Sequence, residues 1–403
     1  MDREQWRPFL KRWSEEWIAG HDPEQDGPLD EAVVRDGWLG FAPASEADVA
    51  AAEARLGRRL PPSLREFLLV TDGWRDAGPF VYRLAGTREL EWLADSDEAH
   101  WIEAYARDDV EEGELDEGAV LGRSLKLSLE GDACVMLLDP EDVDEHGEWA
   151  AYWLSSWSGE GPERHDSFPT LMRGEFASFH ALCQPPGATR DHWDARVEEA
   201  RGAALGGAVD APLAVLAEAA EYGRRRAELL RFQLLVMLGD WHTLSPYTLI
   251  SSYVDAENEP LFAPELLPLL FTEGARGGWG RHDALDFLER SGPEAVRVLV
   301  ADHRRRLREP GFPVPYGDPE FDAAVRRVTA RLADAPEDAA ARRRLEDAVW
   351  PELKDAVRWW RPLSDDHLAP VVLRADPLLD RLITPERGRE LLSVPRGGVP
   401  AKG

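Results

Sequence analysis

The stretch EARLGRRLPPSLREFLLVTDGW, residues 53–74, has the pattern of two short amphipathic helices separated by a break. Ser45-Glu46-Ala47-Asp48 has the residue types of a capping box, so it predicts the start of the first helix. Gly57 fits the glycine that ends a helix, and Pro62 fits the first turn of the next one. Thr71-Asp72-Gly73 ends the second helix, whose apolar positions are Leu64, Phe67, Leu68 and Val70.

The flanking sequence predicts a mixture of helices and clustered strands. Residues 5–18 place apolar side chains at helical spacing, and Ser167 precedes a closing helix. A helix is predicted at 96–107 with Ser96 as its N-cap, and a short strand at 80–84. Three more strands, separated by turns, form a predicted antiparallel meander over 125–129, 133–138 and 149–154. Because the strands cluster instead of alternating with helices, we expect an α+β domain with an antiparallel sheet flanked by helices.

The stretch 53–74 resembles the signature of the SUKH superfamily, also called the Smi/Knr cell-wall-regulator family. That signature combines E-x-x-L-G, L-P, F-L and an N-G or D-G turn, and this chain has Asp72 where the family often has Asn. Residues 132–140 are similar to the family's central strand. The resemblance covers about residues 40–183, and the residues that carry it are Glu53, Leu56, Gly57, Leu60, Pro61, Phe67, Leu68, Gly73, Trp149 and Trp157.

This resemblance implies a domain without catalytic residues that recognises other proteins through its surface. Many bacterial members are immunity proteins of toxin–antitoxin type pairs, which neutralise co-encoded nuclease or deaminase toxins. Fungal members are interaction hubs in cell-wall signalling. The first hypothesis is therefore a non-catalytic immunity protein, and the alternative is a housekeeping regulatory or scaffold protein. An enzyme is the least favoured class.

The C-terminal half has the pattern of an all-α domain built from helical hairpins. Pro and Gly cluster at 184–189, which is typical of a seam between domains. We expect a SUKH-like domain with its N-terminal helix at 1–184, a linker at 185–192, a helical domain at 193–393 and a frayed tail at 394–403. Helices are predicted at 213–222, 226–238, 261–271, 282–290, 294–308, 319–333 and 338–359, and a last short helix has Thr384 as N-cap and Pro385 in its first turn. No fixed-period repeat is evident, so a helical repeat array is only a weak prediction.

Composition predicts a strongly acidic, cytoplasmic protein. The 403 residues include 77 Asp+Glu and 47 Lys+Arg, for a formal net charge of −30, and the mean hydropathy is −0.42. No apolar run reaches the ~18 residues of a membrane span, and residues 1–17 lack the apolar core of a signal peptide. Such a charge repels nucleic acids and anionic membranes and favours a basic protein partner. The sequence leaves the oligomeric state open.

The negative charge is concentrated in the first half of the chain. Residues 1–200 contain 45 Asp+Glu and 19 Lys+Arg, whereas residues 201–403 contain 32 and 28. The densest part is 89–148, with 21 acids and 3 bases. Two interpretations of its most acidic segment remain open: a solvated loop, or a phosphate-mimicking surface that attracts a basic partner. The predicted partner-binding residues are Asp108, Asp109, Glu111, Glu112, Glu114, Asp116, Glu117, Asp72, Trp74, Asp142 and Asp144.

Motifs for catalysis and cofactor binding are missing from the sequence. It contains no phosphate-binding P-loop, no G-x-S-x-G and no H-E-x-x-H. His146-Gly147-Glu148 lacks the P-C-x-x-C partner of a zinc deaminase site, and the acidic turn at 142–147 lacks the glutamate of a calcium loop. Cys134 lies among apolar residues of a predicted strand, so we interpret it as a buried structural thiol. We therefore predict no catalytic residues, no metal and no cofactor.

Overall fold

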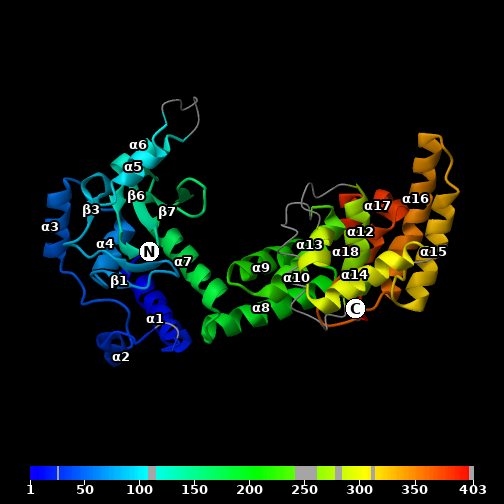
Figure 1. Cartoon of the computed structure of the whole chain (residues 1–403), viewed down its shortest axis with the longest axis horizontal. Coiled ribbons are helices and arrows are strands. Elements are labelled where there is room, and N and C mark those ends of the chain that lie inside the picture. The colour runs from blue at the N-terminus through cyan, green and yellow to red at the C-terminus, as the bar shows by residue number, and fades with distance from the viewer. Residues whose placement is uncertain (25–26, 108–114, 241–260, 277–283, 310–313, 399–403) are drawn as a thin grey trace. The chain divides into compact units, whose positions relative to one another are not determined.

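The chain folds as two compact units, Met1–Asp191 and His192–Gly403 (Figure 1). The computed structural model describes residues 1–24, 27–107, 115–240, 261–276, 284–309 and 314–398. The first unit combines helices with antiparallel sheets, and the described part of the second unit is helical. The predicted fold class, α+β followed by all-α, is confirmed.

The helices of the first unit flank its strands. Its helices are α1 (Arg3–Gly20), α2 (Glu31–Asp36), α3 (Glu46–Leu56), α4 (Pro62–Leu68), a 3-10 turn η1 (Leu93–Asp95), α5 (His100–Tyr105), α6 (Glu117–Arg123) and α7 (Phe168–Cys183). Its strands are β1 (Trp74–Arg75), β2 (Val81–Leu84), β3 (Glu91–Trp92), β4 (Leu125–Lys126), β5 (Ser128–Gly131), β6 (Cys134–Val143), β7 (Trp149–Ser155) and β8 (Glu163–His165). The capping box at Ser45 is present, whereas Ser96 does not cap α5, which begins later, at His100.

The strands form two antiparallel sheets, where the sequence suggested one. The order is β1-β2-β5 in the smaller sheet and β3-β4-β6-β7-β8 in the larger one, which contains the predicted meander. The predicted strand 125–129 is divided between them at Leu127. Its N–H donates to Met136 O (2.8 Å) in one sheet, and its carbonyl accepts from Ala85 N (2.8 Å) in the other. One residue thus connects the two sheets.

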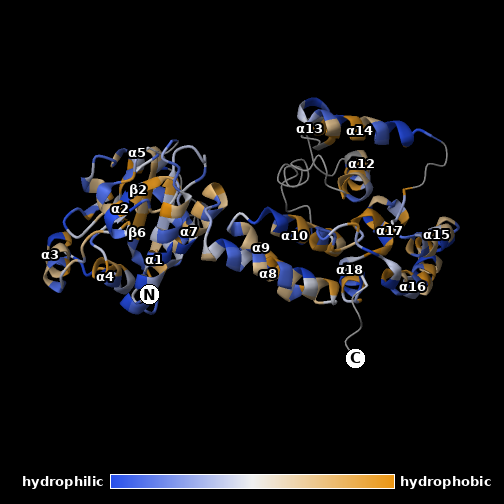
Figure 2. Ribbon diagram, turned by 90° about the horizontal axis from the view of Figure 1, so that it is seen from below, coloured by the Kyte–Doolittle hydropathy of each residue, from blue (hydrophilic) through white to orange (hydrophobic). Residues whose placement is uncertain are grey.

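Aromatic residues fill the core between α1, the stretch 53–74 and α7. Trp6, Trp13 and Trp74 are all 0% exposed. The Trp6 indole N–H donates to Ser63 O (3.0 Å), and the Trp13 and Trp74 rings lie edge to face with centroids 6.2 Å apart. In Figure 2 the apolar colour marks β6, in which Val135, Met136, Leu137 and Leu138 are all 0% exposed. The apolar positions of the amphipathic pattern at 5–18 therefore include residues that pack in the core, such as Trp6 and Trp13.

The predicted linker 185–192 is mostly helical, because α8 (Ala188–Leu205) begins inside it. Its start is bound to α1 by a buried carboxylate. Glu16 Oε1 accepts a hydrogen bond from Thr189 N (2.7 Å), and Glu16 Oε2 lies 3.0 Å from His180 Nε2 of α7. Gly187 has φ +145°, and a side chain there would collide with Glu16. The Pro/Gly seam is thus a packed junction within the first unit.

The described part of the second unit consists mainly of helices. They are α8, α9 (Asp210–Glu221), α10 (Arg225–Leu238), a π-helical turn η3 (Phe262–Leu266), α12 (Leu267–Arg276), α13 (Ala284–Ser291), α14 (Glu294–Arg306), α15 (Pro319–Ala333), α16 (Ala339–Ala356), 3-10 turns η4 (Val357–Trp359) and η5 (Val371–Ala375), α17 (Pro377–Leu382) and α18 (Pro385–Leu392). Thr384 caps α18, as predicted. Among the helices of the described residues, none combines the length and the apolar character that crossing a bilayer requires.

A buried segment around Leu368 organises the core of the second unit. The Leu368 N–H donates to Gln233 Oε1 (2.7 Å), and its carbonyl accepts from Arg396 Nε (2.6 Å). The prediction of a frayed tail from Val394 is wrong for its first residues, because Arg396 is 1% exposed and its N–H donates to Leu205 O (2.9 Å). The hydrogen bonds of Arg396 hold this part of the tail in place, and no local sequence pattern predicts them.

Candidate binding surfaces of the N-terminal unit

The motif residues of 53–74 build the scaffold of this unit. Glu53 accepts a hydrogen bond from Leu60 N (3.0 Å) and pairs with Arg65 Nη1 (2.5 Å), so one carboxylate ties the end of α3 to α4. Gly57 allows the sharp turn between them with φ +69°. Glu148 then binds Ser63 N (3.0 Å) and Oγ (2.5 Å), because Pro61 offers no side-chain cap for α4.

The other motif residues are mostly packed side chains. Leu56, Leu60, Phe67, Leu68 and Trp149 are at most 8% exposed. A Cβ at Gly73, with φ +105°, would lie 2.9 Å from Leu84 O, which explains the glycine of the D-G turn. Trp157 differs from the rest, because it is 52% exposed and its indole N–H donates to Asp132 O (3.2 Å).

Two cavities of opposite charge open on this unit. The acidic cavity has a volume of about 810 Å³ and is lined by Trp17, Asp22, Asp30, Asp76, Tyr82 and Leu182, among others. His21 is the one histidine among its lining residues, and its Nε2 lies 2.7 Å from Gly27 O. Tyr82 and Leu182 are 47% and 60% exposed, so the cavity has an apolar rim beside its carboxylates.

Asp76 differs from the other two carboxylates of the acidic cavity, because both of those accept backbone hydrogen bonds. Asp22 accepts from Glu24 N (2.9 Å), and Asp30 caps α2 through Ala32 N (2.7 Å). Asp76 is half-buried, and its side chain makes no hydrogen bond or ion pair to the described residues. Burial raises the pKa of Asp76 to about 6. The charges of His21 and Arg75 offset only part of the effect of burial on this pKa. A half-buried carboxylate that makes no direct hydrogen bond or ion pair is a natural receptor for a cationic side chain.

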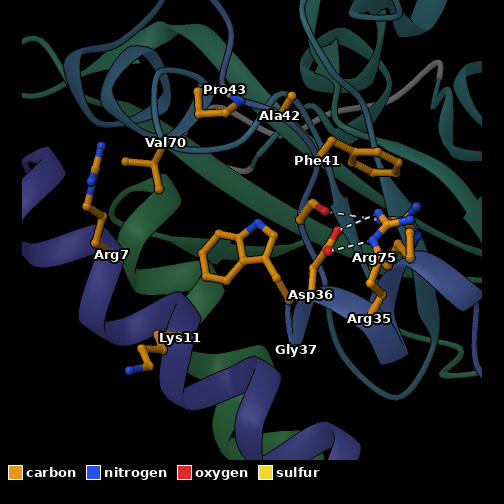
Figure 3. Close-up of a pocket in the computed structure, with 13 residues that line it drawn as sticks. Arg7, Lys11, Arg35, Asp36, Gly37, Phe41, Ala42, Pro43, Val70 and Arg75 are labelled. Atoms are coloured by element: carbon orange, nitrogen blue, oxygen red, sulfur yellow. Dashed lines mark hydrogen bonds and ion pairs between the residues drawn. The ribbon is translucent and has the colours of Figure 1, made fainter.

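The basic groove lies between α1, α2 and the segment 38–43 (Figure 3). Its volume is about 780 Å³, and its charged lining residues are Arg7, Lys11, Arg35, Asp36 and Arg75. Figure 3 shows Arg7 and Lys11 extending from α1 on one side, opposite Arg35, Asp36 and Arg75. The Arg75–Asp30 ion pair (3.1 Å) links the two cavities, because Arg75 lines the groove and Asp30 lines the acidic cavity.

The comparison with known families decides what this unit is. Residues 43–174 match the model of the SMI1 / KNR4 family (SUKH-1). This segment is a SUKH domain. The match covers α3 through the first part of α7, and therefore the scaffold described above. None of the curated proteins and none of the solved structures matches the chain. SUKH domains are in general non-catalytic modules that bind partner proteins.

The structure assigns local roles to several predicted partner-binding residues of the SUKH domain. Asp108, Asp109, Glu111, Glu112 and Glu114 lie outside the described residues. Three of the others accept backbone hydrogen bonds: Asp116 caps α6 through Ala119 N (2.9 Å), Asp72 accepts from Thr87 N (2.5 Å), and Asp144 accepts from His146 N (2.8 Å). Asp142 forms an ion pair with Arg164 (2.7 Å), and Glu117 is half-buried.

Trp74 cannot contact a partner as predicted, because its ring is completely buried. It packs at 5.1 Å against Trp38 and holds the segment 38–43 in place, and that segment forms part of the basic groove. The sequence therefore assigned a core residue to the surface. A large aromatic beside a D-G turn carries no pattern that distinguishes the two positions.

Two of the three bases of the acidic stretch 89–148, Arg123 and Lys126, are each shared among several of its acids. Lys126 is 4% exposed, and its ammonium is within salt-bridge distance of Glu98 (2.9 Å), Asp97 (3.5 Å) and Glu91 (3.8 Å). Arg123 pairs with the buried Asp139 (2.6 Å) and more loosely with Glu141 (3.6 Å). Because the stretch has 21 acids and only 3 bases, and these two bases each lie close to more than one acid, it keeps a net negative charge.

The described residues hold no group of three or more His, Cys, Asp or Glu side chains placed to bind a metal ion. Cys134 is buried, as predicted, and its thiol donates to Phe80 O (3.1 Å). Burial raises the pKa of Cys134 to about 12, so the thiol stays protonated at neutral pH. Its position is that of a structural thiol.

Glu175 on α7 gives this unit a pH-dependent stability. Burial raises its pKa to about 8 from an ordinary 4.5, and its carboxyl fills the space that a Cβ at Gly78 would need. The folded state keeps the proton that the unfolded state releases, so stability falls as the pH rises from about 4.5 through about 8. We expect Glu175→Gln to raise the melting temperature at about pH 9 and to leave it unchanged at about pH 4. Thermal unfolding of both proteins checks this, with the exposed Glu160→Gln as a control that changes neither value.

Proposed function

We propose that this protein is an immunity protein whose SUKH domain neutralises a basic toxin domain of nuclease or deaminase type. The observation that carries the proposal is the match of residues 43–174 to the SUKH-1 family, placed on the acidic half of the chain. Non-catalytic SUKH domains act by binding, so the function requires a surface, and this one is strongly negative. A cytoplasmic location is part of the same proposal.

Electrostatics supports a basic partner. Residues 1–200 contain 45 acids and 19 bases, and Arg123 and Lys126 of the stretch 89–148 each lie close to more than one acid. Such a surface steers a positively charged partner and accelerates its association, with a strong dependence on ionic strength. A toxin that acts on nucleic acid presents a basic cleft, which aligned carboxylates can occupy in place of phosphates.

The acidic cavity provides the anchor that a flat charged surface lacks. Asp76 supplies an uncommitted carboxylate, and Tyr82 and Trp17 supply aromatic faces on which the stem of an Arg or Lys side chain packs. Binding there would also provide the partner that the half-buried Asp76 lacks in the free protein. The helical second unit, with its rigid buried network around Leu368, acts in this proposal as a scaffold or second docking surface.

Affinity capture with recombinant toxin domains tests the proposed function. We expect the full chain to retain at least one basic nuclease- or deaminase-type domain at about 50 mM salt, and to release it as the salt approaches about 500 mM. Inhibition of the captured toxin's activity is the decisive readout. Binding to none of these domains would overturn the proposal and favour a housekeeping regulatory role, whereas salt-independent binding would contradict its electrostatic basis.

Asp76→Asn is expected to weaken capture of the cognate toxin about tenfold at pH 7. The change removes the charge and keeps the shape, and Asn tolerates the backbone of Asp76, whose φ is +50°. Because the pKa of Asp76 is about 6, wild-type binding should itself tighten about tenfold between pH 5 and pH 7 as the carboxyl ionises.

Titration of the toxin at both pH values measures these effects. The control is Asp95→Asn, which removes the same charge from an exposed residue outside the cavity. Equal losses from the two variants would show that only total charge matters. A D76N protein with unchanged affinity would remove the cavity from the binding site.

A further inference from the structure

The basic groove has a charge opposite to that of the unit that contains it. Four of its lining residues are Arg or Lys, and its one carboxylate, Asp36, is held by Arg35 through two hydrogen bonds of 2.7 Å. The surrounding half of the chain has a formal charge of −26. A positive cavity within such a surface requires cations from three elements, α1, α2 and β1, to meet at one place.

Two of these cations are available to a ligand. Arg75 is committed, because it pairs with Asp30 (3.1 Å), donates to Gly40 O (3.1 Å) and stacks on Phe41 at 3.9 Å. Arg7 makes no ion pair with the described residues, and Lys11 lies 3.6 Å from Glu15, in an exposed pair that contributes little. Arg7 and Lys11 are four residues apart on α1, so they face the groove together.

The remaining wall of the groove is apolar and carries one more donor. Trp38 is half-buried, and its indole N–H makes no hydrogen bond to the described residues. Phe41, Ala42 and Pro43 continue the apolar surface beside it. The groove therefore matches a ligand that combines negative charge with apolar side chains.

Of the anionic ligands, an acidic peptide fits these features better than a nucleic acid. A nucleic acid strand carries a charge at every phosphate, and those beyond the groove would meet the acidic surface of the unit. An acidic peptide can limit its charge to the residues that meet Arg7 and Lys11 and place apolar side chains against Trp38. We propose that the basic groove binds an extended acidic peptide segment of a partner protein. This proposal does not depend on the proposed toxin partner, because that partner would contact the negatively charged carboxylates of this unit and not its positively charged groove.

Fluorescence anisotropy with a labelled decapeptide of alternating Glu and Leu tests the proposal on the full chain. We expect saturable binding at about 50 mM salt, weakened about tenfold by Lys11→Glu, which replaces an attraction with a repulsion. Arg12→Glu is the matched control, because Arg12 is the exposed neighbour on α1, carries the same charge and does not line the groove. It should change the affinity less than twofold. Trp38→Phe should weaken binding through loss of its N–H donor.

Each contrary outcome identifies a different error. Equal losses from Lys11→Glu and Arg12→Glu, in proteins with unchanged circular dichroism, would show a diffuse field and overturn the groove as a site. Absence of peptide binding would overturn it as well. Tighter binding of a decamer of thymidylate, or competition by inorganic phosphate at millimolar concentration, would replace the acidic peptide with a phosphate ligand. All these measurements omit the toxin, so failure of the toxin capture experiment leaves them unaffected.

Discussion

Replacing Glu16 with alanine is expected to lower the free energy of unfolding of the N-terminal unit by about 3–5 kcal/mol. Glu16 is 3% exposed and binds two groups that are themselves buried, the His180 ring and the Thr189 N–H. Removal of the carboxylate takes the acceptor from the Thr189 N–H and one contact from the His180 ring, in a place that water does not reach, and this accounts for most of the cost. The same change should loosen the start of α8, whose first turn Glu16 caps.

Tryptophan fluorescence during urea unfolding measures this loss, because 11 of the 16 tryptophans lie in the first 200 residues. Glu15→Ala is the matched control: Glu15 precedes Glu16 on α1, is exposed and forms only a loose pair with Lys11. It should change stability by less than about 0.5 kcal/mol. Similar losses from the two variants would show that the buried contacts of Glu16 contribute little.

The contribution of Glu16 should also depend on pH. Burial by itself would raise its pKa, but hydrogen bonds from His180 and Thr189 prevail and hold the pKa below the ordinary 4.5. The folded state therefore favours the carboxylate, so this stabilisation is complete above about pH 4.5 and is lost as the pH falls through the lowered value. The difference between wild type and E16A should shrink in acid.

Arg396→Ala is expected to destabilise the second unit by about 2–4 kcal/mol. The guanidinium is buried and forms no ion pair with the residues that the structure describes, and burial lowers its pKa to about 9. It donates to Leu368 O and to Leu392 O, both at 2.6 Å, so its loss leaves two carbonyls unpaired and a cavity where the side chain was. These bonds join the end of α18 to the central segment around Leu368.

Far-ultraviolet circular dichroism during thermal unfolding tests this prediction, because the second unit is the more helical one. The control is Arg344→Ala on the exposed side of α16, which should leave the transition unchanged. Arg396→Met should cost less than Arg396→Ala, since it keeps most of the volume and avoids burying a charge. An R396A protein as stable as wild type would mean that the tail does not support the fold.

Local sequence signals located most of the helices and strands. The capping box at Ser45, the left-handed Gly57 and the N-cap at Thr384 act through neighbouring residues, so the sequence shows them directly. The prediction failed where the structure of a segment depends on residues that are distant in the sequence. The strand at 125–129 is split because Leu127 pairs with Met136 on one side and with Ala85 on the other.

The binding surfaces were harder to predict than the fold. The sequence pointed to the acidic stretch 89–148, where charge is dense, and that remains a prediction about net charge. It gave no sign of Asp76, which stands out only because the fold half-buries it without a partner. The basic groove was also missed, because its cations are scattered along the sequence at Arg7, Lys11, Arg35 and Arg75.

The sequence by itself determined the SUKH signature, the positions of most helices and of the central strands, and the concentration of −26 of the −30 charges in the first half. All three are properties of neighbouring residues or of composition, which do not depend on how the chain closes. Only the tertiary structure decided which charges are satisfied. Carboxylates such as Glu53 and Asp72 accept hydrogen bonds from backbone groups of the scaffold. Asp76 and Arg7 instead line cavities where a partner can reach them. The difference depends on which groups folding brings close to each charge.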